Sequence, residues 1–207
     1  MIDFLTSTAF TTFGAPTSWA EVLGFVTGAW CVWLVGRQSV WNWPIGIANN
    51  LVWILLSLPQ GFSRTLRCRS STIALAVWGW RNWVQGCAGD TLPVTGTTGT
   101  EWMWLAGAGI AGTGALMLLL ATATSSTVPF WDAVTTVLSL LATWGQATKR
   151  WESWLLWIAA DLIYIPLYLH KGLTLTALLY AGFLLLCVRG LLAWRRSRAT
   201  EPALAVA

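Results

Sequence analysis

Residues Ser153 to Leu169 read SWLLWIAADLIYIPLYL, an apolar run interrupted by one acidic residue, Asp161. A hydrocarbon core about 30 Å thick needs roughly 20 mostly apolar helical residues to cross it. This run therefore predicts a transmembrane helix, and similar runs fill most of the chain. We expect an all-α polytopic membrane protein with seven transmembrane helices. The predicted spans are Trp19 to Gly36, Trp43 to Leu58, Thr72 to Gln85, Trp102 to Thr122, Phe130 to Thr148, Ser153 to Leu169 and Leu173 to Trp194.

The composition agrees with a membrane protein and argues against a soluble one. Of the 207 residues, 56% are hydrophobic and only 10% are charged, whereas soluble domains carry roughly a quarter charged residues. The 17 tryptophans are more than the two membrane interfaces need for anchoring. We therefore expect some of them to line an interior site.

The polar residues argue against several other classes of protein. The four cysteines are scattered and His170 is the only histidine, so neither a metal site nor a disulfide framework is expected. The net charge of +4 comes from basic residues at helix ends and in the C-terminal tail, which argues against nucleic-acid binding. The sequence contains no nucleotide-binding loop and no nucleophile paired with a base. We expect no cofactor and no enzymatic activity.

The predicted spans divide the chain into six segments. Residues 86–100 are rich in Gly and Thr and contain Pro93, which is typical of an exposed linker. The tail with Arg195, Arg196 and Arg198 is expected in the cytoplasm, because short basic segments are rarely translocated. Seven spans then place the N-terminus outside. The segments are an N-terminal extracytoplasmic segment (1–18), a first three-helix repeat (19–85), the linker loop (86–100), a connecting transmembrane helix (101–123), a second three-helix repeat (129–194) and a cytoplasmic tail (195–207).

The two three-helix segments match each other at one fixed offset, with position i in the first corresponding to position i+111 in the second. The informative pairs are Glu21 with Asp132, Trp43 with Trp154, Asn50 with Asp161, Gly79 with Gly190, and Trp83 with Trp194. Because three helices plus one connecting helix return the chain to its starting side, the repeats are parallel, in a 3+1+3 arrangement. Transporters with parallel repeats place the substrate between the halves, near the midplane.

The sixth span carries the first candidate site residues. Trp154, Trp157 and Asp161 are three and four residues apart, so they share one face of a helix. Indoles stack on flat aromatic ligands, and a cationic ring gains about 0.5 to 2 kcal/mol from cation–π attraction. A charge at midspan is costly unless it faces a cavity or a partner. The alternatives are an aromatic packing seam for the two indoles, and for Asp161 a carboxyl that ties two helices together.

Four further residues complete the predicted binding set. Asn49 and Asn50, the repeat counterparts of the Asp161 region, can hydrogen-bond substrate hydroxyls or an amide, or can join helices to each other. Gln146, at the end of the fifth span, can hold a polar ligand group or face cytoplasmic water. Trp43 is the repeat counterpart of Trp154.

Several motifs resemble those of PnuC transporters, in order and at the expected spacing. They are residues 41–50 (WNWPIGIANN), 79–83 (GWRNW), 151–158 (WESWLLWI) with Asp161, 165–168 (IPLY) and 171–173 (KGL). The resemblance implies a fold related to SWEET sugar transporters and a homotrimer in the bacterial inner membrane. It also implies uptake of nicotinamide riboside by facilitated diffusion, with phosphorylation in the cytoplasm trapping the substrate. The cationic pyridinium and the ribose of that ligand suit the aromatic and Asn/Asp residues above.

Two other functions compete with this one. Proteins that resemble the same family are assigned to thiamine or riboflavin, so a carrier of another vitamin is the first alternative. A membrane sensor or assembly subunit without transport is the second, although such a subunit would need no repeat-paired polar residues at the midplane.

Residues 59–72 depart from the family pattern. The resemblance implies an outer loop with an acidic residue and then a helix that opens with Leu-Gln, whereas this chain has PQGFSRTLRCRSST. Its three arginines, Arg64, Arg67 and Arg69, also break the charge rule for an outer loop. Codons for residues 68–72 exist that read Leu-Gln-Ile-Val-Tyr in the frame one base earlier. We therefore hypothesise a local frameshift, and resequenced codons that are incompatible with that frame would exclude it.

Overall fold

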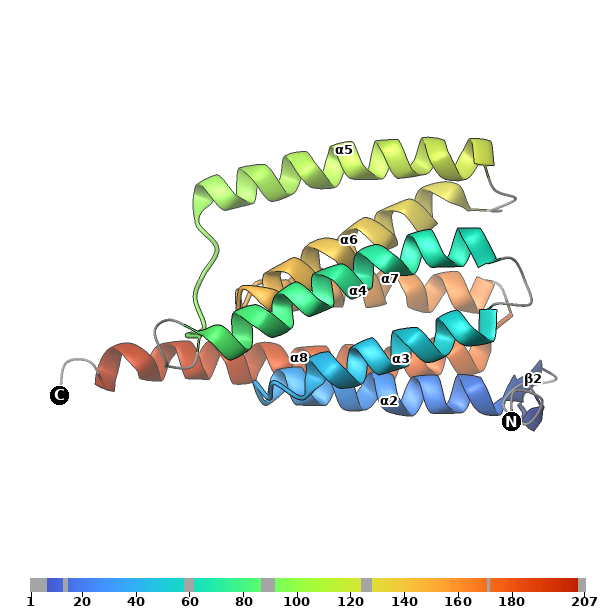
Figure 1. Cartoon of the computed structure of the whole chain (residues 1–207), viewed down its shortest axis with the longest axis horizontal. Coiled ribbons are helices and arrows are strands. Elements are labelled where there is room, and N and C mark those ends of the chain that lie inside the picture. The colour runs from blue at the N-terminus through green and yellow to red at the C-terminus, as the bar shows by residue number, and fades with distance from the viewer. Residues whose placement is uncertain are drawn as a thin grey trace.

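The computed structural model describes residues 7–12, 15–57, 62–86, 92–123, 128–170 and 172–204. These residues form seven helices and one short antiparallel hairpin, in agreement with the predicted all-α fold (Figure 1). The hairpin consists of β1 (Thr8–Thr12) and β2 (Ala15–Ser18). The helices are α2 (Trp19–Gly36), α3 (Asn42–Ser57), α4 (Phe62–Gln85), α5 (Gly99–Ala123), α6 (Pro129–Ala147), α7 (Ser153–His170) and α8 (Thr174–Leu204).

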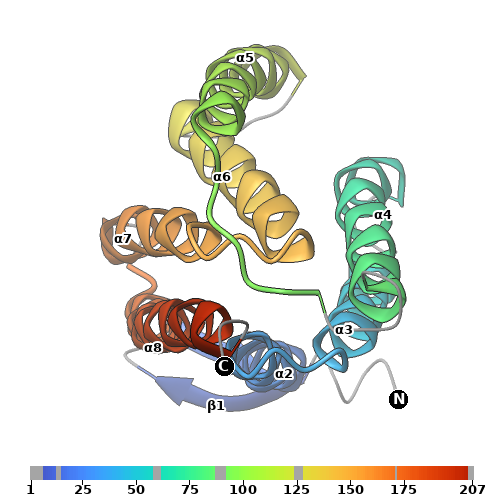
Figure 2. The same cartoon turned by 90° about the vertical axis from the view of Figure 1, so that its left-hand side faces the viewer.

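Six of these helices pack as a ring, and α5 lies outside it. Neighbours around the ring are α2, α3, α4, α6, α7 and α8, and α8 returns to α2. Helix α5 packs on the outer side of α6, as the end-on view shows (Figure 2). The hairpin lies at one end of the bundle, called the hairpin end below. The last turns of α8 project from the opposite end, called the C-terminal end.

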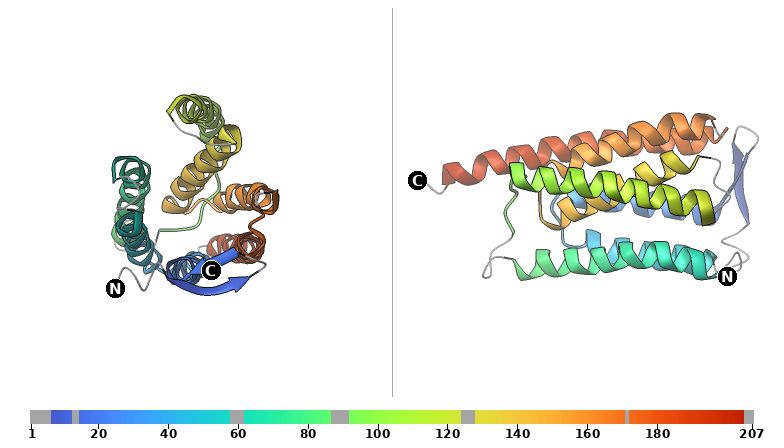
Figure 3. Two further views of the ribbon diagram at one scale, coloured as in Figure 1. Left: turned by 90° about the vertical axis from the view of Figure 1, so that its right-hand side faces the viewer. Right: turned by 90° about the horizontal axis from the view of Figure 1, so that it is seen from above.

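The predicted repeat is present in the ring. Helices α2, α3 and α4 correspond to α6, α7 and α8, and the two groups of three helices face each other (Figure 3). Helices α3 and α7 begin at Asn42 and Ser153, and α2 and α6 end at Gly36 and Ala147, so both pairs of boundaries keep the offset found in the sequence. Corresponding helices also run in the same direction, so the repeats are parallel.

Helix length and hydropathy identify three membrane-crossing helices among the described residues. They are Gly99–Thr122, Ser153–His170 and Thr174–Ala199, and the shorter helix Val22–Gly36 is also apolar. Each of the other predicted spans also falls on a helix of the ring.

One predicted helix boundary was wrong. Helix α4 begins at Phe62, earlier than the predicted Thr72, because residues 62–71 contain no proline or glycine that would stop a helix. Helix α8 extends to Leu204, into the predicted tail, and the location of that tail stays a prediction. The hairpin lies within the predicted N-terminal segment. Residues 58–61, where part of the hypothesised frameshift falls, lie outside the described residues.

Candidate functional site

One face of α7 brings together the strongest candidate residues. Trp157, Asp161, Tyr164 and Tyr168 follow each other at spacings of four, three and four residues, so their side chains form one stripe, called the α7 stripe below. Helix α7 packs between α6 and α8. The stripe meets both neighbours, because Asp161 contacts α8 and Tyr164 interacts with hydroxyls of α6. The stripe therefore lies on the side of α7 that contacts both neighbouring helices, and its role in binding stays a prediction.

Asp161 is a buried acid with a weak partner. Its side chain is 4% exposed, and the Cys187 thiol on α8 donates to its Oδ2 at 3.5 Å. Among the described residues, no cationic side chain forms a salt bridge with Asp161. A midspan carboxyl without a countercharge is costly, which makes it a candidate partner for a polar or cationic ligand.

The indole of Trp157 adds a second unsatisfied group to the stripe. Its Nε1 is buried and has no hydrogen-bond partner, although the ring packs against the core of the bundle. A buried donor without a partner loses its hydration without compensation. A ligand that offers an oxygen to Trp157 and a positive charge to Asp161 would satisfy both groups at once.

The two tyrosines of the stripe form an aromatic cluster with Tyr180 of α8, toward the hairpin end. The rings of Tyr164, Tyr168 and Tyr180 lie with centroids 4.7 to 5.7 Å apart, and Phe183 packs edge-on against Tyr180. This cluster was not predicted from the sequence. The signal was present, since Tyr164 and Tyr168 continue the helical spacing of Trp157 and Asp161, but the contribution of Tyr180 from α8 needed the fold.

The matching face of α3 carries smaller groups. Gly46 stands at the repeat position of Trp157, and Asn50 at that of Asp161. The side-chain amide of Asn50 donates to the Gly46 carbonyl at 2.9 Å, and Asn49 beside it is half-buried. A Cβ added at Gly46 would meet only Cys31 Sγ, at 3.9 Å. The first repeat therefore carries a glycine and an amide where the second carries an indole and an acid.

The predicted residues Trp154 and Trp43 lie in a different place. Trp154 is fully buried at the C-terminal end, edge-on to Trp194 with ring centroids 5.6 Å apart. Trp43 packs edge-on against Trp83 at the same distance. The indole of each lies on the glycine of the neighbouring helix, Gly190 or Gly79 in the two repeats. The structure thus gives both indoles a packing role, and their contact with a ligand stays a prediction.

Gln146 is also part of the packed C-terminal end. Its residue is 9% exposed, and its backbone carbonyl accepts a hydrogen bond from Trp83 Nε1 at 3.0 Å. The sequence offered its amide as a ligand contact, and that role stays a prediction too.

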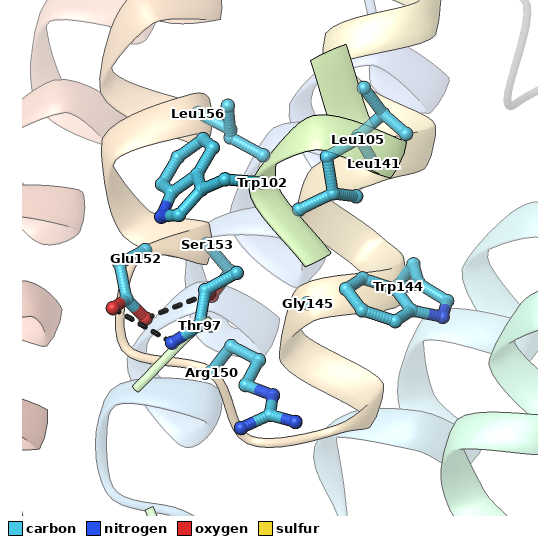
Figure 4. A pocket seen from close by; sticks show the side chains of 10 residues that line it. All are labelled: Thr97, Trp102, Leu105, Leu141, Trp144, Gly145, Arg150, Glu152, Ser153 and Leu156. Atoms are coloured by element: carbon cyan, nitrogen blue, oxygen red, sulfur yellow. Dashed lines mark hydrogen bonds between the residues drawn. The ribbon is translucent and has the colours of Figure 1, made fainter. Parts of the chain in front are cut away.

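A hollow outside the ring involves none of the predicted residues. It lies between the linker, α5, α6 and α7 (Figure 4). Glu152, which lines it, accepts hydrogen bonds from the backbone N–H and the hydroxyl of Thr97, at 2.9 and 3.1 Å. Its lining residues are Thr97, Trp102, Leu105, Leu141, Trp144, Gly145, Arg150, Glu152, Ser153 and Leu156.

One lining residue, Thr97, belongs to residues 92–98 of the linker, called the strap below. Thr95 pairs with Arg150 of the α6–α7 loop, and the Arg150 guanidinium donates to the Thr95 hydroxyl at 2.9 Å and to the Gly96 carbonyl at 2.7 Å. The same guanidinium forms a salt bridge of 2.5 Å with Glu101 at the start of α5. The strap therefore fastens the connecting helix to the second repeat, and its polar groups are engaged in structure.

No metal site was found in the part of the chain that the structure describes, since no three His, Cys, Asp or Glu side chains converge there. The candidate polar groups on α3 and α7 are a carboxyl, amides and an indole N–H group. Such groups suit an organic ligand with a flat ring and hydroxyls.

Known proteins match this chain over nearly its whole length. The riboflavin/roseoflavin transporter RibM of Streptomyces davaonensis is 27% identical over 209 residues, covering 98% of each chain. The nicotinamide riboside transporter PnuC of Escherichia coli is 20% identical and covers 89% of this chain and 88% of its own. That of Neisseria mucosa is 25% identical and covers 87% and 73%.

A solved structure shares the fold. The crystal structure of the vitamin B3 transporter PnuC superposes with a TM-score of 0.68 at 22% identity, and the match covers 88% of this chain and 83% of that one. The family model described as nicotinamide mononucleotide transporter matches residues 18–196, which include both repeats, the strap and the α7 stripe. The chain therefore belongs to this family of PnuC-type membrane transporters.

Proposed function

We propose that the chain takes up nicotinamide riboside by facilitated diffusion through the bacterial inner membrane. In this proposal, phosphorylation in the cytoplasm traps the substrate, the N-terminus lies outside, and the protein works as a homotrimer. The observation that supports the substrate best is the pairing of a buried acid, Asp161, with a buried unpartnered indole N–H, Trp157, on one face of α7.

The chemistry of the ligand matches these groups. A pyridinium ring is flat and cationic, so it can stack on an indole or a tyrosine ring and gain cation–π attraction. The carboxyl of Asp161 offers that ring a countercharge, and no cationic side chain among the described residues competes for it through a salt bridge. The ribose hydroxyls can accept from Trp157 and can exchange hydrogen bonds with the amides of Asn49 and Asn50.

Riboflavin is the second candidate, and a different observation favours it. The riboflavin/roseoflavin transporter RibM covers 98% of this chain, so the likeness extends through both repeats and both ends. The isoalloxazine ring of riboflavin is flat but uncharged. The tyrosine cluster could stack on it, whereas Asp161 would then need to be protonated or bonded to a ring N–H. A non-transporting sensor is disfavoured, because the family consists of transporters.

Isothermal titration calorimetry of the detergent-purified protein separates the candidates. Nicotinamide riboside, riboflavin and thiamine are each titrated into the same preparation, and nicotinamide is the control for a ring without charge or ribose. We expect saturable binding of nicotinamide riboside with an affinity at least ten-fold above that of the other ligands. Tighter binding of riboflavin would replace the first proposal by the second, and no binding to a folded protein would contradict both.

A further inference from the structure

At the C-terminal end, two tryptophans each form a hydrogen bond to a helix of the other repeat. Trp83 on α4 donates its indole N–H to the Gln146 carbonyl of α6, and the distance is 3.0 Å. Trp194 on α8 donates its indole N–H to the Val35 carbonyl of α2, also at 3.0 Å. The two donors are repeat partners and so are the two acceptors, which means that the same bond is made in both directions.

The two acceptors are carbonyls that each take a second donor. Val35 and Gln146 lie in the last turns of α2 and α6, and their carbonyls also accept a backbone N–H, from Gln38 at 2.9 Å and from Lys149 at 3.1 Å respectively, so the indole uses the remaining lone pair. Water can take the place of an indole on such a carbonyl if the two repeats move apart. The bonds can therefore break and re-form at low cost, unlike bonds within a helix.

A third cross-repeat contact lies beside the two indoles. The Lys149 ammonium donates to the side-chain carbonyl of Gln38 at 3.1 Å and lies 4.8 Å from the centre of the Trp83 ring. The Gln38 amide donates in turn to the Ser197 hydroxyl on α8, at 3.0 Å. Gln38 and Lys149 are repeat partners, and both have left-handed backbones, with φ of 56° and 51°. Lys149 is 4% exposed, so this contact is buried between the two repeats.

Aromatic rings in the same region also pack between the two repeats. Trp83 and Trp194 lie with centroids 6.1 Å apart, one from each repeat. Each is also edge-on to a second indole of its own repeat, Trp43 or Trp154. On α7, Trp154 lies nearly one helical turn closer to the C-terminal end than Trp157, so this ring cluster lies between the α7 stripe and that end.

We infer that Trp83 and Trp194, with the Gln38–Lys149 pair, form the gate that closes the substrate path at the C-terminal end. Release at that end requires both indole–carbonyl bonds to break together as one repeat rotates against the other. The gate does not depend on which vitamin is carried, so it can fail or hold independently of the substrate proposal.

Thiol labelling of Cys187 measures the opening of this gate. Cys187 is 3% exposed, bonds to Asp161, and lies on α8 seven residues before Trp194, or about 10 Å along the helix. The background carries Cys31→Ala, Cys68→Ala and Cys87→Ala. The protein is reconstituted in proteoliposomes, and cleavage of a C-terminal tag shows on which side of the membrane the C-terminus lies. A membrane-impermeant methanethiosulfonate is then added on that side.

Trp83→Phe and Trp194→Phe each remove one indole donor. Loss of one net hydrogen bond shifts an equilibrium by about five-fold, so we expect Cys187 to react about five-fold faster in either variant and faster still in the double variant. The matched controls are Trp43→Phe and Trp154→Phe. These lose the same ring volume in the same cluster, but their indole N–H groups have no partner. We expect their labelling rates to stay within about two-fold of the parent.

Two results would overturn the gate. Equal acceleration in all four variants would show that ring volume rather than the cross-repeat bonds keeps the path closed, and unchanged labelling in both donor variants would show that the bonds do not limit opening. Thermal unfolding verifies that each variant is folded. If the Phe variants are unfolded, Gln38→Asn serves instead, because Asn tolerates a left-handed backbone and is too short to hold Lys149. It should also accelerate labelling, and no acceleration would contradict the gate.

Discussion

The two repeats match closely in their packing at the C-terminal end, called the frame below. They match less well on the faces of their central helices, α3 and α7. At the C-terminal end the halves are nearly copies, with Trp–Gly packing and an indole–carbonyl bond made in both directions. On the faces of α3 and α7 they diverge, since Gly46 and Asn50 correspond to Trp157 and Asp161. The difference indicates a division of labour, in which the symmetric residues hold and move the repeats and the asymmetric residues bind the ligand.

This division has a physical reason. Two repeats that move against each other about an axis between them must make equivalent contacts, so their contact positions keep the same residues. A ligand such as a nucleoside has no such symmetry. The groups that surround it must differ between the halves, with charge and aromatic rings on one side and amides on the other.

The largest effect is expected from a change in the symmetric frame. A Cβ at Gly190 would overlap the indole of Trp154, which is fully buried and cannot move aside. We expect Gly190→Ala to lower the free energy of unfolding by about 3 kcal/mol, or to prevent folding, and Gly79→Ala to do the same against Trp43. Thermal unfolding followed by intrinsic fluorescence in detergent measures the shift.

The control for this change is Gly182→Ala in the same helix. No atom lies within 4 Å of a Cβ at Gly182, so the added methyl should be neutral or slightly stabilising. Equal destabilisation by Gly182→Ala and Gly190→Ala would contradict the role of the Trp–Gly contact.

The next effect concerns the acid of the α7 stripe. Asp161→Asn keeps the shape of the side chain and removes its charge, so nicotinamide riboside should bind about thirty-fold more weakly, which corresponds to about 2 kcal/mol. An uncharged ligand such as riboflavin should change its affinity by less than about three-fold. Calorimetric titration of both ligands measures the contrast, and parallel losses for the two would show that Asp161 acts on the fold rather than on ligand charge.

A somewhat smaller effect is expected at the indole of the stripe. Trp157→Ala removes a stacking surface worth about 1 to 2 kcal/mol, so the affinity should fall about ten-fold. The control is Trp104→Ala on α5, whose side chain is 76% exposed and far from the ring interior. Binding that is unchanged in Trp157→Ala would place the site elsewhere in the ring.

The smallest effect is expected at the strap. Arg150→Gln removes the salt bridge to Glu101 and weakens the bonds to Thr95 and Gly96. Both charged groups are partly exposed, so we expect only a small loss of stability. Faster amide hydrogen exchange over residues 92–98 should report it, with little change in ligand affinity. Arg37→Gln, in the matching loop of the first repeat, is the control and should leave exchange of the strap unaltered.

The sequence was sufficient for most of the fold. Apolar runs of membrane-crossing length and the fixed offset between the two halves predicted the helices, their order and their parallel repeat. Helix α4 was predicted to start too late, because its arginines argue against a membrane span but do not stop a helix. Hydropathy measures membrane burial, whereas helix formation depends on backbone conformation.

The candidate site was only partly predictable. The spacing of Trp157 and Asp161 indicated a shared face, and both residues lie in the continuous helix α7, so they share that face. Trp154 lies on the same face but packs against Trp194, because it is nearly one helical turn closer to the C-terminal end than Trp157. The tyrosine cluster and the left-handed Gln38–Lys149 pair depend on contacts between distant segments, which spacing along one helix does not reveal.

A structure of the protein with nicotinamide riboside bound is the most direct test of the proposed division between frame and site. We predict that the pyridinium ring lies within about 6 Å of the Trp157 ring, with its charge beside the Asp161 carboxyl and its ribose toward Asn49 and Asn50. A ligand seated instead between Trp43 and Trp83, or in the hollow under the strap, would contradict the assignment of binding to the asymmetric α7 stripe.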